Sequence, residues 1–287
     1  MNEEICYLDA TELSAAIRDK IFSSQEVVQA FLQRIEQVNP IINALIAFPN
    51  DVLQSAREAD IALGRGDVWG PLHGVPFTVK DCIDTKGIVT TRGSRLFANR
   101  VPNHDATVVE RIKGAGGILI GKSNMPEFAL WWETDNLVYG RTNNPWNIER
   151  TPGGSSGGEA AAIVSGMSPL GIGSDVGGSV REPANYCGTV GLKATHGRIP
   201  LTGHWPETLL RFMHVGPLAT TIRDIGLSFN LMAGPDGLDS YAVPYPIDDG
   251  ADLSLDPVGL KIGWCPEGPF GPIDREVQST VSEAARA

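Results

Sequence analysis

Two serines with glycine neighbours are the residues of this 287-residue chain best suited to covalent chemistry. Ser155 lies in TPGGSSGGE at 151–159, and Ser179 lies in GSDVGGSVREP at 173–183. Glycines beside a serine let the backbone turn sharply and direct its N–H groups at a ligand. Upstream, Lys80 follows the apolar segment VPFTV. These three side chains predict hydrolytic acyl transfer without histidine.

A serine hydroxyl is a poor nucleophile until a base removes its proton. Lysine can be that base only if burial lowers its pKa towards neutrality, and Lys80 ends a probable core strand. A second hydroxyl between lysine and nucleophile can relay the proton and return it to the leaving amine. Successive N–H groups at 176–179 are suited to bind an oxyanion. The alternative is two glycine-rich turns and a surface lysine, which composition does not exclude.

Two competing motifs are less favoured. GGILIGKS at 116–123 matches the phosphate-loop pattern, but its Ile-Leu-Ile centre is typical of a strand interior. GGSSG at 153–157 matches the nucleophile elbow of α/β-hydrolases, which requires a strand before the serine. The preceding asparagine-rich segment with Pro152 is not a strand pattern. The later histidines also have no recognisable setting for a triad.

Composition excludes several other classes of protein. A net charge of −11 argues against a nucleic-acid surface. No apolar run approaches the ~18–20 residues that span a bilayer, and no secretory segment opens the chain, so we expect a cytoplasmic protein. The four scattered cysteines predict neither a disulfide framework nor a metal site, and nothing activates a Cys187–His196 nucleophile pair. We expect no cofactor.

The elements that must position these residues follow from capping and periodicity. Helices are predicted from Asp9, from Ser23 to a stop at Asn39-Pro40, from Asp51 to Gly64, from a cap at Asp105 to Lys113, at 158–166 and from near Asp274. Strands are predicted at 75–79, 118–120, 170–172 and 260–264. This alternation predicts an α/β fold in a single domain, 1–287, with a mixed, largely parallel central sheet and helices on both faces.

Beyond these single features, the chain resembles the amidase signature family of Ser–Ser–Lys hydrolases. The resemblance runs from about Leu13 to Trp264 and includes both serine loops. Further matching segments are GPLHGVPFTVKD at 70–81, TTRGS at 90–94, GKSNMPEF at 121–128, GLK at 191–193 and VGPL at 215–218.

The resemblance implies a role for each site residue. Ser179 would be the nucleophile, Ser155 the cis-serine that shuttles protons, and Lys80 the base. The remaining implied residues are the oxyanion-hole amides of Val176, Gly177, Gly178 and Ser179, the bracing groups Asp175, Arg181 and Ser156, and the pocket residues Met125, Trp131 and Trp132. For the two tryptophans, ordinary core packing is an equal alternative.

Three departures from the family pattern are visible. Ala194 replaces the usual proline, and Glu182 replaces a neutral residue after Arg181, so that it either pairs with Arg181 or alters substrate preference. Family members generally continue well beyond 287 residues. The fold is therefore expected to lack its C-terminal part.

The first functional hypothesis is an amidase that hydrolyses carboxylic amide C–N bonds of a small molecule through an acyl-serine intermediate. One alternative is the glutaminase (A-type) subunit of a tRNA-dependent amidotransferase. A further alternative is a catalytically incompetent truncated fragment. The expected protein partner is a second copy in a homodimer or an amidotransferase subunit, with neither nucleic acid nor membrane.

Overall fold

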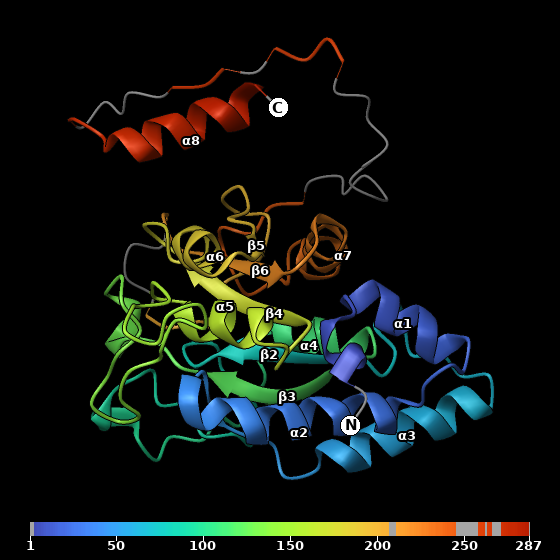
Figure 1. The fold of residues 1–287 in the computed structure, drawn as a ribbon. Coiled ribbons are helices and arrows are strands. Elements are labelled where there is room, and N and C mark those ends of the chain that lie inside the picture. Colours follow the sequence, from blue (N-terminus) through green and yellow to red (C-terminus); the bar gives the residue numbers. More distant parts are fainter. Residues whose placement is uncertain (1–2, 207–210, 245–257, 262, 266–270, 287) are drawn as a thin grey trace. The chain divides into compact units, whose positions relative to one another are not determined.

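The computed structural model describes residues 3–206, 211–244, 258–261, 263–265 and 271–286 (Figure 1). Its internal contacts divide the chain into two units, residues 1–251 and 252–287. The second unit contains helix α8 (Arg275–Arg286), where the Glu276 N–H donates to the Asp274 side chain at 2.8 Å. The predicted helix near Asp274 is therefore confirmed. The predicted strand at 260–264 is wrong, because its described residues adopt no strand.

The first unit is built on a six-stranded mixed sheet with the order β1-β3-β2-β4-β6-β5. The strands are β1 (Leu45–Ala47), β2 (Pro76–Lys80), β3 (Ile118–Ser123), β4 (Leu170–Asp175), β5 (Val190–Gly191) and β6 (His214–Ala219). Strand β2 pairs in parallel with β3 and β4, whereas the outer pairs are antiparallel. The predicted mixed α/β fold is confirmed, and its parallel part is the three central strands.

The central strands are buried along their whole length, and their sequences PFTVK, ILIGKS and LGIGSD carry polar residues mainly at the C-terminal end. Strand β6 was not predicted because Gly216 and Pro217 lie in its middle. Pro217 pairs with Ile172 of β4, and its carbonyl accepts from the Leu192 N–H at 3.1 Å. A Cβ on Gly216 would lie 2.0 Å from the Leu192 carbonyl oxygen. Glycine is therefore required for close approach there, not for a turn.

Helices surround this sheet. They are α1 (Ala10–Arg18), α2 (Ser24–Ile42), α3 (Val52–Gly64), α4 (Thr107–Gly114), α5 (Gly157–Val164), α6 (Arg181–Cys187) and α7 (Ile222–Met232). Short 3-10 turns occupy Glu3–Tyr7, Arg95–Phe97 and Glu127–Ala129. Capping boxes at Asp9 and Ser23 start α1 and α2 as predicted. Figure 1 shows α2 and α3 beside β3, and α6 and α7 beside β5 and β6.

Three predicted helix boundaries are wrong, and one of them is the end of α5, which stops at Val164 instead of Gly166. Helix α2 continues through Pro40 to Ile42, because a proline near the last turn removes only one backbone bond. The Asn39 side chain also fixes this end by accepting from the Ala44 and Leu45 N–H groups at 2.9 Å. Helix α4 is capped at Ala106, since Asp105 instead accepts from the Lys86 N–H and pairs with Lys113 at 2.7 Å.

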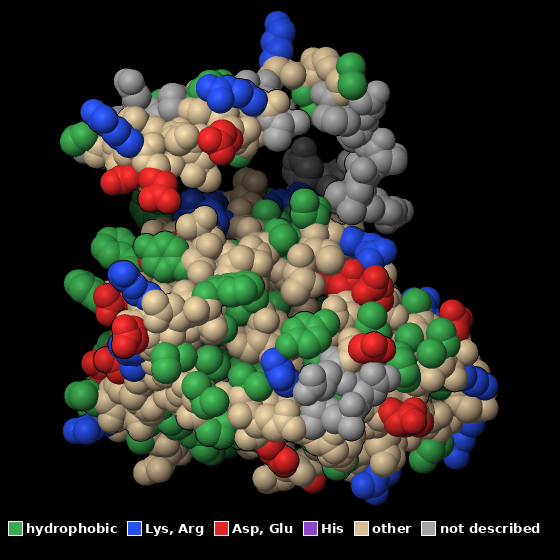
Figure 2. All heavy atoms as spheres, viewed as in Figure 1, with side chains coloured by type: hydrophobic (Ala, Val, Ile, Leu, Met, Phe, Trp, Pro, Cys, Tyr) green, Lys and Arg blue, Asp and Glu red, His purple; other side chains and the backbone are tan. Residues whose placement is uncertain are grey.

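The main hydrophobic core lies between the sheet and the helices, with Phe31, Phe77 and Ile120 among its fully buried members. Helix α5 contacts β2 and β4, the two strands that carry the predicted lysine and lead into the second serine loop. Acidic and basic side chains are interspersed over the face visible in Figure 2. Within the described part of the chain, no helix is long and apolar enough to cross a membrane.

Candidate active site

Lys80 is the last residue of β2, and its side chain is fully buried. Its Nζ lies 2.7 Å from Ser155 Oγ, 2.9 Å from Ser156 Oγ and 3.1 Å from Ser174 Oγ. A longer contact of 3.4 Å reaches the Ser174 carbonyl. The predicted surface alternative is thereby excluded, because the amine meets a cluster of hydroxyls instead of solvent.

Burial lowers the pKa of Lys80 to about 8, because the interior disfavours the ammonium form. The nearby Cys82, Asp175 and Glu159 act in the opposite direction and raise this pKa. The result is an amine that is largely protonated at pH 7 and largely neutral at pH 9. Such a lysine can accept a proton near the physiological pH range.

The first serine loop precedes α5, and its peptide bond between Gly154 and Ser155 is cis. A Cβ on Gly154 would lie 2.7 Å from the Glu133 nitrogen, so only glycine permits this packing. The Ser156 N–H donates to the Ser179 carbonyl at 3.1 Å, which ties the two serine loops together. The sequence TPGGSSGG thus folds into a loop that carries hydroxyls to the buried amine.

The second serine loop is organised by Asp175 at the end of β4. Its carboxylate accepts from Arg181 Nε at 3.0 Å and Nη2 at 2.9 Å, and from the N–H groups of Gly178 at 2.9 Å and Val180 at 3.0 Å. Burial alone would raise the pKa of Asp175, but these hydrogen bonds outweigh it and lower the pKa to about 2. The contacts are those expected of the bracing groups Asp175 and Arg181.

Glu182, the residue that departs from the family pattern, does not pair with Arg181. Its Oε2 accepts from the Gly154 N–H at 2.8 Å, while Arg181 pairs with Asp175. The Glu182 carboxylate, in the first turn of α6, therefore anchors the first serine loop through the Gly154 N–H. The other departure, Ala194, is buried.

A cavity of about 190 Å³ opens beside the second serine loop. It is lined by Ala129, Leu130, Trp131, Trp132, Val176, Gly177 and Ser179. Trp131 and Trp132 are 63% and 57% exposed, so they are not core residues. Met125, by contrast, is fully buried in the main core and is not among the lining residues. Ala129 and Leu130 were missed because no chemical motif marks an apolar wall.

The backbone amides of this loop differ in their partners. The Gly178 N–H is engaged by Asp175. Within the described residues, no group accepts from the N–H groups of Val176, Gly177 and Ser179. These three amides remain open to a ligand oxygen beside Ser179, and the oxyanion-hole role stays a prediction.

Two buried groups around Lys80 were missed at the sequence level. Ser174 lies just before Asp175, and only its position on the strand adjacent to β2 brings it to the amine. Glu159 in α5 is fully buried and accepts from Thr78 Oγ1 at 2.6 Å. Burial raises the pKa of Glu159 to about 7, although Thr78, Lys80 and Lys122 lower it. No pattern in the alanine-rich helix marks this residue.

We expect Glu159→Gln to stabilise the fold at pH 8 and to have little effect at pH 5. The unfolded chain releases this proton near 4.5 and the folded chain near 7, so stability falls as pH rises between these values. This difference in the pKa of Glu159 lowers the free energy of unfolding by about 3 kcal/mol at and above pH 8. Thermal melts at both pH values measure it, with the exposed Glu149→Gln as control. An equal effect at both pH values would contradict this assignment.

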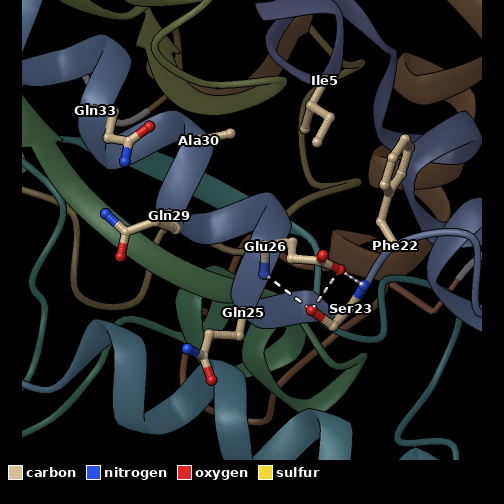
Figure 3. A pocket seen from close by; sticks show the side chains of 8 residues that line it. All are labelled: Ile5, Phe22, Ser23, Gln25, Glu26, Gln29, Ala30 and Gln33. Carbon is tan, nitrogen blue, oxygen red and sulfur yellow. Dashed lines mark hydrogen bonds between the residues drawn. The ribbon is translucent and has the colours of Figure 1, made fainter. Parts of the chain in front are cut away.

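A wider hollow lies on the surface at the start of α2 (Figure 3). Ile5 and Phe22 line it together with the capping box, in which Glu26 accepts from the Ser23 N–H and hydroxyl at 2.8 Å. Its polar groups therefore have a structural task at the helix N-terminus. None of the residues predicted for catalysis lines it.

Comparison with protein families gives a match to the Amidase model over residues 26–287. The chain belongs to the amidase family. Amidase membership agrees with the two serine loops and the buried lysine described above, and the predicted family is confirmed.

Individual amidase relatives cover nearly the whole chain. It is 42% identical over 290 residues to the A-type subunit of the glutamyl-tRNA(Gln) amidotransferase of Carboxydothermus hydrogenoformans, and 39% identical over 292 residues to an acylamidase of Rhodococcus erythropolis. Each alignment covers 99% of this chain, but the chain spans about 59–60% of the relatives' length. A 6-aminohexanoate cyclic dimer hydrolase structure matches with a TM-score of 0.89 and 32% identity, covering 98% of this chain and 58% of that one.

Proposed function

We propose that this chain hydrolyses carboxylic amides through an acyl-serine intermediate. Ser179 is the nucleophile, and Ser155 and Lys80 form the proton relay. The observation that carries the proposal is the 2.7 Å contact between the buried Lys80 amine and Ser155, beside a cavity lined by Ser179. Ser155 is 1% exposed and does not line the cavity, which favours Ser179 as the group that meets substrate.

In this relay, neutral Lys80 takes the hydroxyl proton of Ser155 as Ser155 takes that of Ser179, and Ser179 Oγ bonds to the amide carbon. The C–N bond then breaks, and the proton returns through Ser155 to the departing amine. Water then gives a proton to Lys80 through Ser155 and bonds to the acyl carbon. The bond between this carbon and Ser179 Oγ breaks, the proton returns to Ser179 Oγ, and the carboxylic acid leaves. We assign stabilisation of the oxyanion to the N–H groups of Val176, Gly177 and Ser179.

The cavity supports a small, uncharged acyl group as substrate. Its volume of about 190 Å³ is below the usual range for drug-sized ligands, and its side chains are apolar apart from Ser179. Trp132 is held over the site by its Nε1–H, which donates to the Gly177 carbonyl at 3.3 Å. An aromatic wall of this kind suits an aliphatic or aromatic acyl chain.

The direct test is covalent labelling of the purified chain with a fluorophosphonate probe, followed by mass spectrometry of the modified peptide. We expect one modified residue, Ser179. Labelling of Ser155 alone would reverse the two serine roles. A cooperatively folded chain that takes no label and hydrolyses no amide would instead support the incompetent-fragment hypothesis.

The labelling rate should rise about tenfold per pH unit below pH 8 and level off above it. The reason is that only neutral Lys80 can accept the Ser155 proton, and burial places the pKa of Lys80 at about 8. Rate measurements from pH 6 to 10 give the profile. A rate that is flat across this range would contradict lysine as the base.

The second candidate is the glutaminase subunit of a tRNA-dependent amidotransferase, favoured by the 42% identity to a protein of that kind. In this case the released ammonia passes to a partner subunit, whereas an independent amidase would act alone or as a homodimer. Glutamine as the one good substrate, together with co-purification of a second subunit, would favour it. Turnover of simple acyl amides by the isolated chain would favour the amidase.

A further inference from the structure

Four polar atoms, the first of them Lys80 Nζ, form a continuous line of contacts. Ser174 Oγ lies 3.1 Å from Lys80 Nζ, Cys82 Sγ lies 3.5 Å from Ser174 Oγ, and His204 Nε2 lies 3.3 Å from Cys82 Sγ. All four side chains are buried. Backbone contacts fix the far end, since His204 bridges to Ile83 and the Trp205 N–H donates to the Cys82 carbonyl at 3.0 Å.

The tautomer of His204 decides which atom donates in each hydrogen bond along this line. Burial and the charges of Lys80 and Arg92 lower the pKa of His204 to about 3, so the imidazole is neutral and carries one N–H. The backbone of Pro206 acts in the opposite direction and raises this pKa, as a carbonyl that accepts from the ring does, because a proline nitrogen has no proton to donate. With the imidazole proton on Nδ1, towards Pro206, Nε2 lies 3.3 Å from Cys82 Sγ and presents its lone pair to the thiol. Cys82 donates its S–H to His204, which leaves its sulfur as an acceptor for the Ser174 hydroxyl.

Two of the serines around Lys80 thus donate their hydroxyl protons to groups other than the lysine amine. Ser174 donates to Cys82, and Ser156 Oγ donates to the Ser174 carbonyl at 3.1 Å while accepting from the Ser174 N–H at 3.3 Å. Both hydroxyls can only accept from the amine. A neutral lysine has two N–H bonds and one lone pair, so Ser156 and Ser174 take both N–H bonds. The lone pair cannot face the Ser174 carbonyl, which lies 3.4 Å away and only accepts, so it faces Ser155 at 2.7 Å.

We propose that Cys82 and His204 are positioning residues that orient the hydrogen bonds behind Lys80, so that its lone pair faces Ser155. Without the thiol, the Ser174 hydroxyl can turn and donate to the amine, where it competes with Ser155 for the one lone pair. This inference rests on the proposed function, since it explains how the buried amine is aimed at the relay serine.

The first arm of the test does not depend on activity. Long-range ¹H–¹⁵N NMR of the ¹⁵N-histidine-labelled wild-type chain reports which ring nitrogen of His204 carries the proton, with His204→Gln used to assign the signals. We expect a proton on Nδ1 and a bare Nε2 between pH 6 and 9. A proton on Nε2 would reverse the line and overturn the proposal.

The second arm compares Cys82→Ala with Cys82→Ser in fluorophosphonate labelling at pH 9. Serine can donate to His204 and accept from Ser174, whereas alanine can do neither. We expect Cys82→Ala to lose about 10-fold in labelling rate, a part of what a general base supplies, and Cys82→Ser to stay within about threefold of wild type. Cys6→Ala, at a buried cysteine in the first 3-10 turn, is the control and should keep the wild-type rate.

Stability separates this role from simple packing. A buried hydroxyl in place of a thiol is more costly than a methyl group, so a packing role predicts Cys82→Ser to be the more impaired variant in both rate and melting temperature. The proposal predicts the opposite order for rate alone, and equal rates in both variants would refute it. If the wild-type chain takes no label, the proposed function fails, and the NMR arm still decides the direction of the line.

Discussion

Ser179→Ala should abolish fluorophosphonate labelling and lower amide turnover by about 10⁴-fold or more, the range seen when a serine nucleophile is removed. The loss is expected because no other hydroxyl lines the cavity among the described residues. The loop itself should persist, since Asp175 holds it through Arg181 and the Gly178 and Val180 amides. Labelling kinetics and intact-mass analysis measure the effect.

Two controls make this result specific. Ser228→Ala removes a buried hydroxyl in α7 that donates to the Asp224 carbonyl, and it should leave labelling unchanged. Ser155→Ala should slow labelling strongly without moving the modified residue. A Ser179→Ala chain that still reacts with the probe would rule out the proposed nucleophile.

Lys80→Met should lower labelling and turnover by about 10²–10⁴-fold, the usual contribution of a general base. Methionine fills the buried volume at the end of β2 but can accept no proton from Ser155. The reduced rate should also lose its rise between pH 6 and 9, because the group whose pKa is about 8 is gone. Rate profiles of both chains, normalised to the folded fraction, provide the measurement.

The matched control is Lys122→Met in the neighbouring strand β3. Lys122 is equally buried, but its amine serves Ile83, Thr85 and Thr90 instead of the serine loops. This variant should lose stability and keep the pH profile of wild type in the molecules that fold. Equal losses of rate in both variants would show that a buried amine matters here only for folding.

Much of this site could be predicted from the sequence because its signals are local. The glycines around Ser155 and Ser179 mark loops, and the apolar run before Lys80 marks a buried strand. Capping boxes likewise start α1 and α2 where expected. The segment that matches the phosphate-loop pattern is strand β3, because its Ile-Leu-Ile residues are buried in the core.

The remaining features depend on contacts between distant segments. Cys82 and His204 are 122 residues apart, and no spacing rule relates them. Strand β6 contains a glycine and a proline, which argue against a strand in the sequence. Only its pairing with β4 and β5 shows why both residues are tolerated there. Met125 belongs to a matching motif, yet its side chain turns into the core. Local patterns indicate which residues can do chemistry, whereas tertiary pairing decides which of them meet.

The low pKa of Asp175 has a consequence for how the site responds to a fall in pH. The carboxylate that closes the second serine loop stays ionised down to about pH 2, whereas Lys80 gains its proton near pH 8. Acidification from pH 8 to pH 5 would therefore protonate the proposed base while the carboxylate that holds the second serine loop stays ionised. If Lys80 is the base, labelling lost in this range should return when the pH is raised, because the loop has kept its contacts with Asp175.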